Sequence, residues 1–191
     1  MALAPHRFKF TLEDYYALHD MGLFNDKHVE LWDGDVIEMT VNPPHALAIM
    51  RLQKIFERSF GDVALVSSQN PLDLNEENTL PEPDLMLLKD LPYADTAGKA
   101  RHPIPADVLL LVEVSDSTLK DDKGRKLARY ARHGIQEYWV ADIENEQWFV
   151  YRKPLAENYR EEQRYPFAEA FAPSAFHKQA RVWLEPNQTT K

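Results

Sequence analysis

The sequence lacks cysteine altogether, and it also lacks any apolar run long enough to span a membrane. The first absence excludes disulfide bonds and thiolate metal sites, and it is compatible with a reducing compartment. The N-terminal stretch MALAPHRFKF has no apolar core of signal-peptide length. We therefore expect a cytoplasmic protein that does not associate with a membrane.

Positive charge is scarce, with 22 Lys and Arg residues against 31 Asp and Glu residues and a net charge of −9. Such an acidic balance counts against a generic, tight nucleic-acid binder. Basic residues nevertheless gather between Lys120 and Arg132, where six of them accompany two acidic ones. This segment is either a local basic face or an ordinary solvated helix surface, and composition leaves both interpretations open.

Internal repeats, low-complexity tracts and linker-like stretches are also absent from the sequence. The composition is 44% hydrophobic and 28% charged, which is ordinary for a globular protein. A chain of 191 residues is long enough to bury a sizeable core. We expect a single domain over residues 1–191, with its core at about 10–185.

The segment from Ala106 to Asp142 carries the clearest structural pattern in the chain. Its apolar run over 108–112 has the length of a buried strand. A basic helical stretch follows over about 120–133, and Gly134 is a candidate C-cap. Residues 136–142 then predict a second short strand. Strand, helix and strand in this order indicate a crossover unit within a mixed sheet.

Further elements are expected on both sides of this unit. Thr11 followed by Asp14 resembles a capping box that opens a short helix. The remaining predictions are a hairpin over 29–39 around Asp33-Gly34, a helix over 45–60, strands at 63–66, 71–74 and 85–88, a long loop over 89–106, a late hairpin over 147–152 and 159–165, and a final packed strand between 174 and 183.

Two carboxylates, Asp84 and Glu113, each lie at the boundary of a strongly apolar strand. If these strands are neighbours, the two side chains converge at one end of the sheet. Carboxylates held close together repel unless a cation lies between them. Hard oxygen ligands without cysteine favour Mg²⁺ or Mn²⁺ over Zn²⁺. This combination suits the hydrolysis of a phosphodiester by an activated water.

The helical stretch places Asp122, Lys126 and Tyr130 on one stripe, because they follow at four-residue steps. Lys126 adjoins Leu127, so the stripe borders the side that faces the core. A lysine there is suited to stabilising charge that develops on phosphorus. The simpler alternative is a surface ion pair between Asp122 and Lys126 worth a few tenths of a kcal/mol.

Two N-terminal residues are weaker candidates. Glu30 lies between Val29 and Leu31, so on a strand its side chain points to the opposite face, towards solvent or a cleft. His45 lies near the start of a predicted helix. It is either a capping or partly buried histidine, or a ligand for a phosphate or a polar group that supports the site.

These residues together resemble a known family. The sequences PD at 83–84, EVS at 113–115, DKGRKLARY at 122–130 and GIQEYWVAD at 134–142 are similar to the Uma-type "putative restriction endonuclease" family of the PD-(D/E)XK nuclease superfamily. The stretch ELWDGDVIEM at 30–39 and a histidine after a proline resemble the N-terminal part of that family. The resemblance covers about residues 10–185.

The resemblance implies an α/β (α+β) restriction-endonuclease-like fold, with a mixed central β-sheet flanked by helices and an added N-terminal hairpin. It implies a Mg²⁺ or Mn²⁺ site at Asp84 and Glu113, with the Val114 carbonyl as a further ligand and Glu30 as an additional acid. The superfamily lysine is replaced by Ser115, and Lys126 would substitute for it from the helix. His45, Ser115, Asp122 and Tyr130 are candidates for supporting or phosphate contacts.

Three functions remain open at this level. The first is a metal-dependent DNA endonuclease, in which a homodimer would place two basic helices on one face. The second is a catalytically silent binding or regulatory module of the same fold, which Ser115 and the negative charge favour. The third is a two-carboxylate hydrolase such as a glycosidase, which leaves the lysine and the basic helix unexplained.

Overall fold

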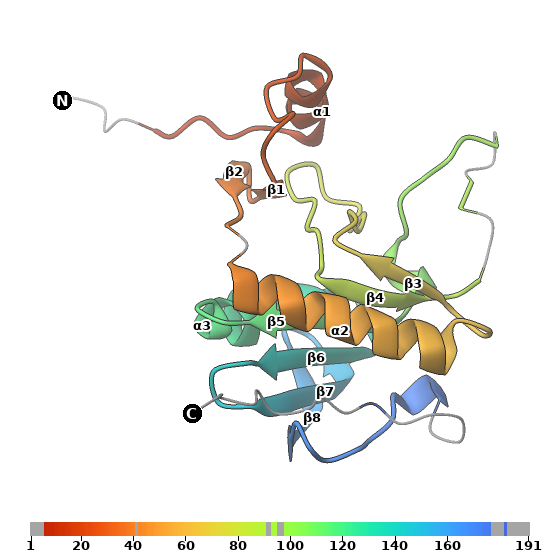
Figure 1. Ribbon diagram of the computed structural model, residues 1–191. Coiled ribbons are helices and arrows are strands. Elements are labelled where there is room, and N and C mark those ends of the chain that lie inside the picture. The colour runs from red at the N-terminus through yellow and green to blue at the C-terminus, as the bar shows by residue number, and fades with distance from the viewer. Residues whose placement is uncertain (1–5, 41, 91–92, 95–97, 177–181, 183–191) are drawn as a thin grey trace.

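The computed structural model of the protein describes residues 6–40, 42–90, 93–94, 98–176 and 182 (Figure 1). Its centre is a six-stranded sheet in the order β3-β4-β5-β6-β7-β8. Only β5 and β6 pair in parallel among these neighbours. The strands are β3 (Leu65–Ser68), β4 (Leu85–Leu88), β5 (Val108–Ser115), β6 (Glu137–Asp142), β7 (Gln147–Leu155) and β8 (Asn158–Pro166). The predicted mixed sheet is therefore confirmed.

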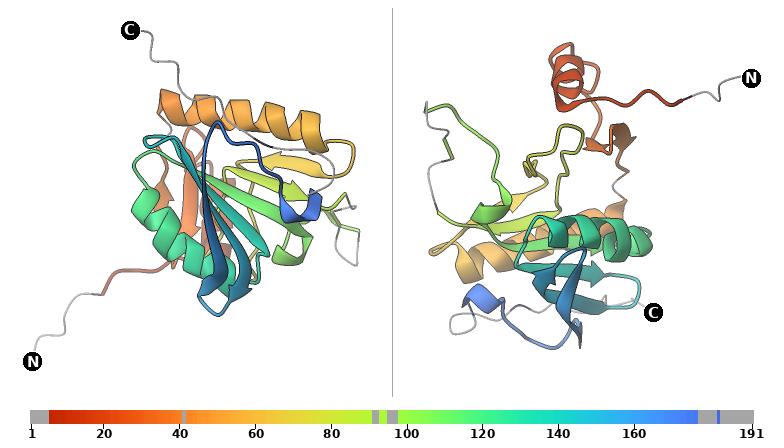
Figure 2. Two further views of the ribbon diagram at one scale, coloured as in Figure 1. Left: turned by 90° about the horizontal axis from the view of Figure 1, so that it is seen from below. Right: turned by 180° about the vertical axis from the view of Figure 1, so that it is seen from behind.

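Helices cover both faces of this sheet (Figure 2). The long helix α2 (Pro43–Phe60) packs Leu52 and Phe56 against one face, where they join Val112 of β5 in one apolar cluster. On the other face, Tyr130 of helix α4 (Leu127–Arg132) clusters with Leu111 of β5. Successive residues of β5 thus point into opposite clusters, as the two-residue period of a strand requires. No helix in the described part of the chain is long and apolar enough to cross a membrane.

The N-terminal part forms a small unit of its own beside the sheet, with α1 (Leu12–Asp20), β1 (Val29–Trp32) and β2 (Asp35–Glu38) (Figure 1). The predicted capping box is confirmed, because Thr11 and Asp14 exchange hydrogen bonds at the start of α1. The predicted hairpin is also confirmed. Asp33 and Gly34 both have positive φ, at 48° and 76°, as the tight turns of twisted hairpins require.

The crossover between β5 and β6 differs from the single helix that the sequence predicts. It consists of a short α3 (Leu119–Asp121), a π-helical segment (Asp122–Lys126) and α4. One carbonyl of the π-helical segment accepts a hydrogen bond from the sheet. Tyr138 Oη of β6 donates to the Asp122 carbonyl at 2.9 Å. Periodicity alone misses this irregularity, because the stabilising partner lies sixteen residues away on β6.

Gly134 ends α4 as predicted. Its φ is +76°, and the Ile135 amide donates back to the Tyr130 carbonyl at 3.0 Å, which is the bond of a Schellman motif. A residue with a Cβ is strained in this left-handed conformation.

We therefore expect Gly134→Ala to lower the free energy of unfolding by about 1 kcal/mol. Gly124→Ala is the matched control, because both positions have open space around an added Cβ but only Gly134 has a positive φ. The difference between the two variants in urea denaturation isolates the cost of backbone strain at Gly134. Equal changes in both would contradict the explanation.

Three predicted elements differ from the structure. The strand expected at 63–66 lies at Leu65–Ser68. Residues 71–74 bury Leu72 and Leu74 but form no strand, because their amides pair with loop carbonyls such as that of Pro81 and not with a ladder. In the tail, Ser174–Phe176 forms a 3₁₀ turn, and Val182 bridges Phe171. The rest of that predicted strand lies outside the described residues.

Candidate active site

The register of β4 against β5 brings Asp84 and Glu113 together. Leu85 pairs with Val112, so the residues one step beyond this pair, Asp84 and Glu113, are opposite each other at the end of the sheet. Both are buried, at 8% and 2% exposure. Asp84 Oδ2 accepts a hydrogen bond from the Val114 amide at 2.7 Å, so the carboxylate continues the pairing where the backbone ladder stops. The expected convergence of the two acids is confirmed.

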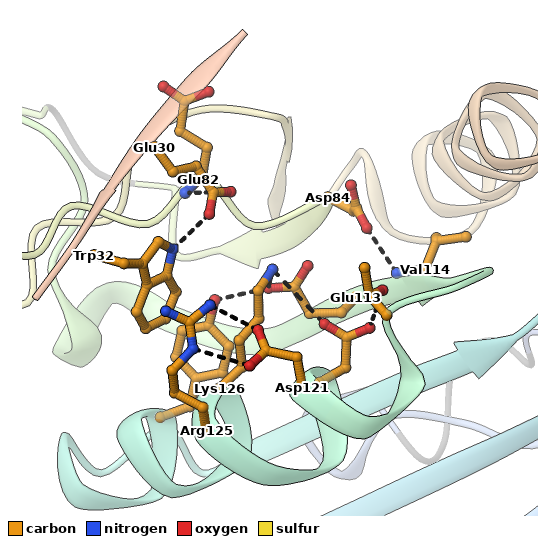
Figure 3. Close-up of polar contacts among 12 residues, drawn as sticks. Glu30, Trp32, Glu82, Asp84, Glu113, Val114, Asp121, Arg125 and Lys126 are labelled. Carbon is orange, nitrogen blue, oxygen red and sulfur yellow. Dashed lines mark hydrogen bonds and ion pairs between the residues drawn. The ribbon is translucent and has the colours of Figure 1, made fainter. Parts of the chain in front are cut away.

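Lys126 reaches the same place from the π-helical segment. Its Nζ lies 3.1 Å from Glu113 Oε1 and 3.8 Å from Asp122 Oδ1, and all three side chains are buried (Figure 3). Tyr130 Oη donates to the same Glu113 oxygen at 2.7 Å. The predicted Asp122–Lys126 ion pair is therefore present, but its expected position on the surface is wrong, because both side chains are buried.

Asp122 and Lys126 enter the site together because they are four residues apart and share one face of the helical segment. Both residues are buried, while Lys123 and Arg125 between them remain partly or fully exposed. The segment that carries them is π-helical, and single π turns inside helices recur at functional sites. Asp122 is further fixed by Thr118, whose hydroxyl donates to it at 2.6 Å.

His45 lies in the first turn of α2 and contacts Asp84. The cap of this helix is Asn42, whose side chain accepts from the His45 amide, so His45 is not the capping residue. Its Nε2 lies 3.1 Å from Asp84 Oδ2. Burial alone lowers the pKa of His45, but the hydrogen bond and charge of Asp84, with Asp122 and the Val114 backbone, raise that pKa above its ordinary value.

Glu30 faces the same cavity from β1 but does not contact Asp84 or Glu113. It is 2% exposed, its Oε2 accepts from Trp32 Nε1 at 2.5 Å, and its Oε1 accepts from the Glu82 amide at 3.3 Å. Of the two surroundings predicted for it, solvent or a cleft, the structure has the cleft.

Glu82 also lines the cavity, although the sequence pattern did not mark it as a candidate. Burial, followed by the charge of Glu30, raises the pKa of the Glu82 carboxyl to about 7, and His28 Nε2 lies 3.3 Å from it. The signal available in the sequence was its place between Pro81 and Pro83, in the extended segment that leads to Asp84.

One cavity of about 190 Å³ lies between the N-terminal hairpin, the start of α2 and the π-helical segment, and its lining includes Glu30, His45, Glu82, Asp84, Glu113, Asp122 and Lys126. Asp and Glu residues outnumber Lys and Arg residues in the lining. Ser115, at the superfamily lysine position, is fully buried, and its hydroxyl has no hydrogen-bond partner among the described residues. Ser115 supplies no charge, so the cation at Glu113 comes from Lys126.

Burial and the closeness of the acids change the pKa values of the groups in the site. Burial raises the pKa of the Glu113 carboxyl well above its ordinary value; Lys126 opposes this rise, and Asp84, Asp122 and Glu30 add to it. Burial lowers the pKa of the Lys126 ammonium, but Glu113, Glu30 and Asp122 raise it further than burial lowers it. The site thus holds one ammonium among several closely spaced carboxyl groups, of which Glu113 and Glu82 bind their protons more tightly than usual.

The donor set fits a magnesium-like cation. Protein partners of Asp84 all meet Oδ2 and those of Glu113 all meet Oε1, which leaves Asp84 Oδ1 and Glu113 Oε2 without partners among the described residues. Within those residues no group of three or more His, Asp or Glu side chains is arranged to hold a metal. A site with two carboxylates is nevertheless sufficient for Mg²⁺, which keeps several waters.

Comparison with known proteins identifies the family of the chain and supports its fold. The model of the Uma2 family, described as "Putative restriction endonuclease", matches residues 12–184. A crystal structure of "a putative nuclease belonging to DUF820" from Anabaena variabilis superimposes with a TM-score of 0.64 and 15% identity, over 89% of this chain and 94% of that one. The type IIG restriction endonuclease BpuSI gives a TM-score of 0.36 at 16% identity, over 59% and 12%, which is too low to support a comparison. No curated protein matches the chain.

Proposed function

Because the chain belongs to the Uma2 restriction endonuclease family and has a restriction-endonuclease-like fold, we propose that it is a metal-dependent endonuclease that hydrolyses phosphodiester bonds in DNA. The observation that carries this proposal is the meeting of Asp84, Glu113 and Lys126 in one buried cavity, with Lys126 Nζ 3.1 Å from Glu113. Because Asp and Glu residues outnumber Lys and Arg residues in its lining, the cavity requires a further cation before it can accept a phosphate.

In this proposal Asp84 and Glu113 hold Mg²⁺ or Mn²⁺ through the two oxygens that have no partner among the described residues, and the Val114 carbonyl offers a further oxygen. When bound, such a cation polarises a phosphoryl oxygen and lowers the pKa of an attacking water. Val114 and His45 fix the orientation of Asp84 through contacts of 2.7 and 3.1 Å to its other oxygen.

Lys126 supplies the permanent positive charge of the proposed mechanism. Its ammonium is held by Glu113 and Asp122 and is suited to stabilising the negative charge that grows on the phosphoryl oxygens in the transition state. Tyr130 holds Glu113 Oε1 at 2.7 Å, which leaves the opposite oxygen directed to a ligand. Glu30 adds negative charge to the cavity and is oriented by Trp32.

The net charge of −9 means that DNA binding depends on local cations, and the basic residues of 120–126, two of which line the cavity, provide them. Association into a homodimer would bring two such segments to one DNA molecule.

We expect the purified protein to cut DNA in the presence of Mg²⁺ or Mn²⁺ and to lose all cutting in excess EDTA, with recovery when Mg²⁺ is returned. Supercoiled plasmid and single-stranded DNA of diverse sequence are the substrates, and gel electrophoresis measures the products. A folded protein that cuts neither substrate with either metal would favour the silent binding or regulatory module.

A further inference from the structure

Arg125 lines the cavity and immediately precedes Lys126 in the π-helical segment (Figure 3). Two neighbours hold its guanidinium. The carboxylate of Asp121 accepts from Nε at 2.9 Å and from Nη2 at 2.7 Å, and the ring of Trp32 lies against the guanidinium at 4.5 Å from its central carbon. A long, normally mobile side chain is therefore fixed in one orientation.

Trp32 connects this guanidinium to the acidic site. Its indole Nε1 donates to Glu30 at 2.5 Å, and its ring meets Tyr130 edge to face at 6.5 Å between centroids. Tyr130 in turn donates to Glu113. Arg125 is thus linked to Glu113 through the contact between Trp32 and Tyr130.

Arg125 differs from Lys126, the other Lys or Arg residue in the described lining of the cavity, in its exposure and its pairing. The Lys126 side chain is 7% exposed and is paired with two carboxylates, whereas the Arg125 side chain is 37% exposed. No acceptor for its Nη1 is found among the described residues, and Asp121 occupies only Nε and Nη2. Two N–H groups on one nitrogen are therefore available to a ligand that enters the cavity.

We propose that Arg125, held by Trp32 and Asp121, binds a backbone phosphate of the substrate strand beside the phosphate that is cleaved. The inference rests on the proposed function and assigns a positioning residue to it. An oriented guanidinium binds phosphate with directed, charge-assisted hydrogen bonds, and its orientation costs no further side-chain entropy on binding. The acidic lining would otherwise repel the neighbouring phosphates of the strand, because only the scissile phosphate faces the metal.

The test compares three variants: Arg125→Gln, Arg125→Lys and, as the control, Arg132→Gln. Arg132 is a half-exposed arginine of α4 that pairs with Glu157 and does not line the cavity. Fluorescence anisotropy with labelled duplex and single-stranded oligonucleotides gives the dissociation constant between 50 and 200 mM salt. Thermal melts verify folding, and cleavage assays give KM and kcat.

We expect Arg125→Gln to weaken DNA binding about tenfold and to reduce the slope of log Kd against log salt by about one, as loss of one phosphate contact should. KM should rise by a similar factor while kcat changes much less, because the contact is made in ground state and transition state alike. Arg125→Lys should recover part of the affinity, and Arg132→Gln should stay within about twofold of wild type.

The outcomes separate this inference from the proposed function. If wild type binds DNA without cutting it and Arg125→Gln does not bind, the phosphate contact stands and the nuclease proposal fails. If Arg125→Gln matches Arg132→Gln in affinity and salt slope, or if wild type does not bind DNA at all, the inference is wrong. A loss confined to single-stranded DNA with an unchanged salt slope would indicate base stacking and would also overturn it.

Discussion

Asp84→Asn is expected to reduce metal-dependent DNA cleavage by about 10³-fold or more while the protein remains folded. The substitution removes one of the two carboxylate charges proposed to hold the metal. It keeps an oxygen that can accept the hydrogen bond of the buried Val114 amide, which Asp84 Oδ2 accepts at 2.7 Å in the wild type. Alanine would leave that amide without a partner, so asparagine separates the loss of catalysis from the loss of structure.

The experiment measures initial rates of plasmid cleavage at saturating Mg²⁺ beside thermal melts of each protein. Asp62→Asn is the control, because this exposed aspartate follows α2 and does not line the cavity. The control should cut at the wild-type rate. Cutting that survives in a folded Asp84→Asn protein would mean that the metal site lies elsewhere.

Lys126→Met is expected to lose activity and also to destabilise the protein by about 3–5 kcal/mol in metal-free buffer at neutral pH, or roughly 6–20 °C in melting temperature. The chain contains no other Lys or Arg in contact with Glu113 among the described residues. Removing the ammonium therefore leaves Glu113 and Asp122 buried without a compensating cation, so at neutral pH each must either stay charged at a cost in stability or take up a proton. Methionine fills a similar volume, so the effect reports charge more than packing.

The loss of stability in Lys126→Met should depend on pH. The pKa of Glu113 is raised well above its ordinary value of 4.5 in the folded protein, and Lys126 is the neighbour that lowers it, so the variant raises it further. A carboxyl whose folded pKa is raised binds its proton more tightly when folded, and stability increases as pH falls from above that pKa towards 4.5. The difference between variant and wild type should therefore be smaller at low pH.

Urea denaturation with EDTA at pH 5 and pH 8 tests this expectation. Lys120→Met is the matched control, because Lys120 is exposed on α3 in the same segment, and it should change stability by less than about 0.5 kcal/mol. Equal losses for the two variants, or a loss at position 126 that does not vary with pH, would show that the Lys126–Glu113 pair is not a buried ion pair. Activity of Lys126→Met must be measured at a temperature where the variant is folded.

Local patterns were sufficient for much of the fold. The capping box of Thr11 and Asp14, the tight turn at Asp33-Gly34 and the C-terminal glycine of α4 each fix neighbouring residues through short-range bonds and backbone preferences. The strand, helix and strand of the central unit followed from apolar periodicity. The same pattern predicted a strand at residues 71–74 wrongly. The apolar side chains of this segment are buried, but its amides donate to loop carbonyls and not to a neighbouring strand.

The sequence by itself determined which charged residues would be costly to bury, and therefore which were candidates: Asp84 and Glu113 beside apolar strands, and Lys126 beside the core stripe. Only the tertiary structure decided that they meet. The β4–β5 register sets the two acids opposite each other, and the packing of the π-helical segment beside β5 brings Lys126 to Glu113. Contacts between distant segments, such as Trp32 with Arg125, depend on packing that no local pattern encodes.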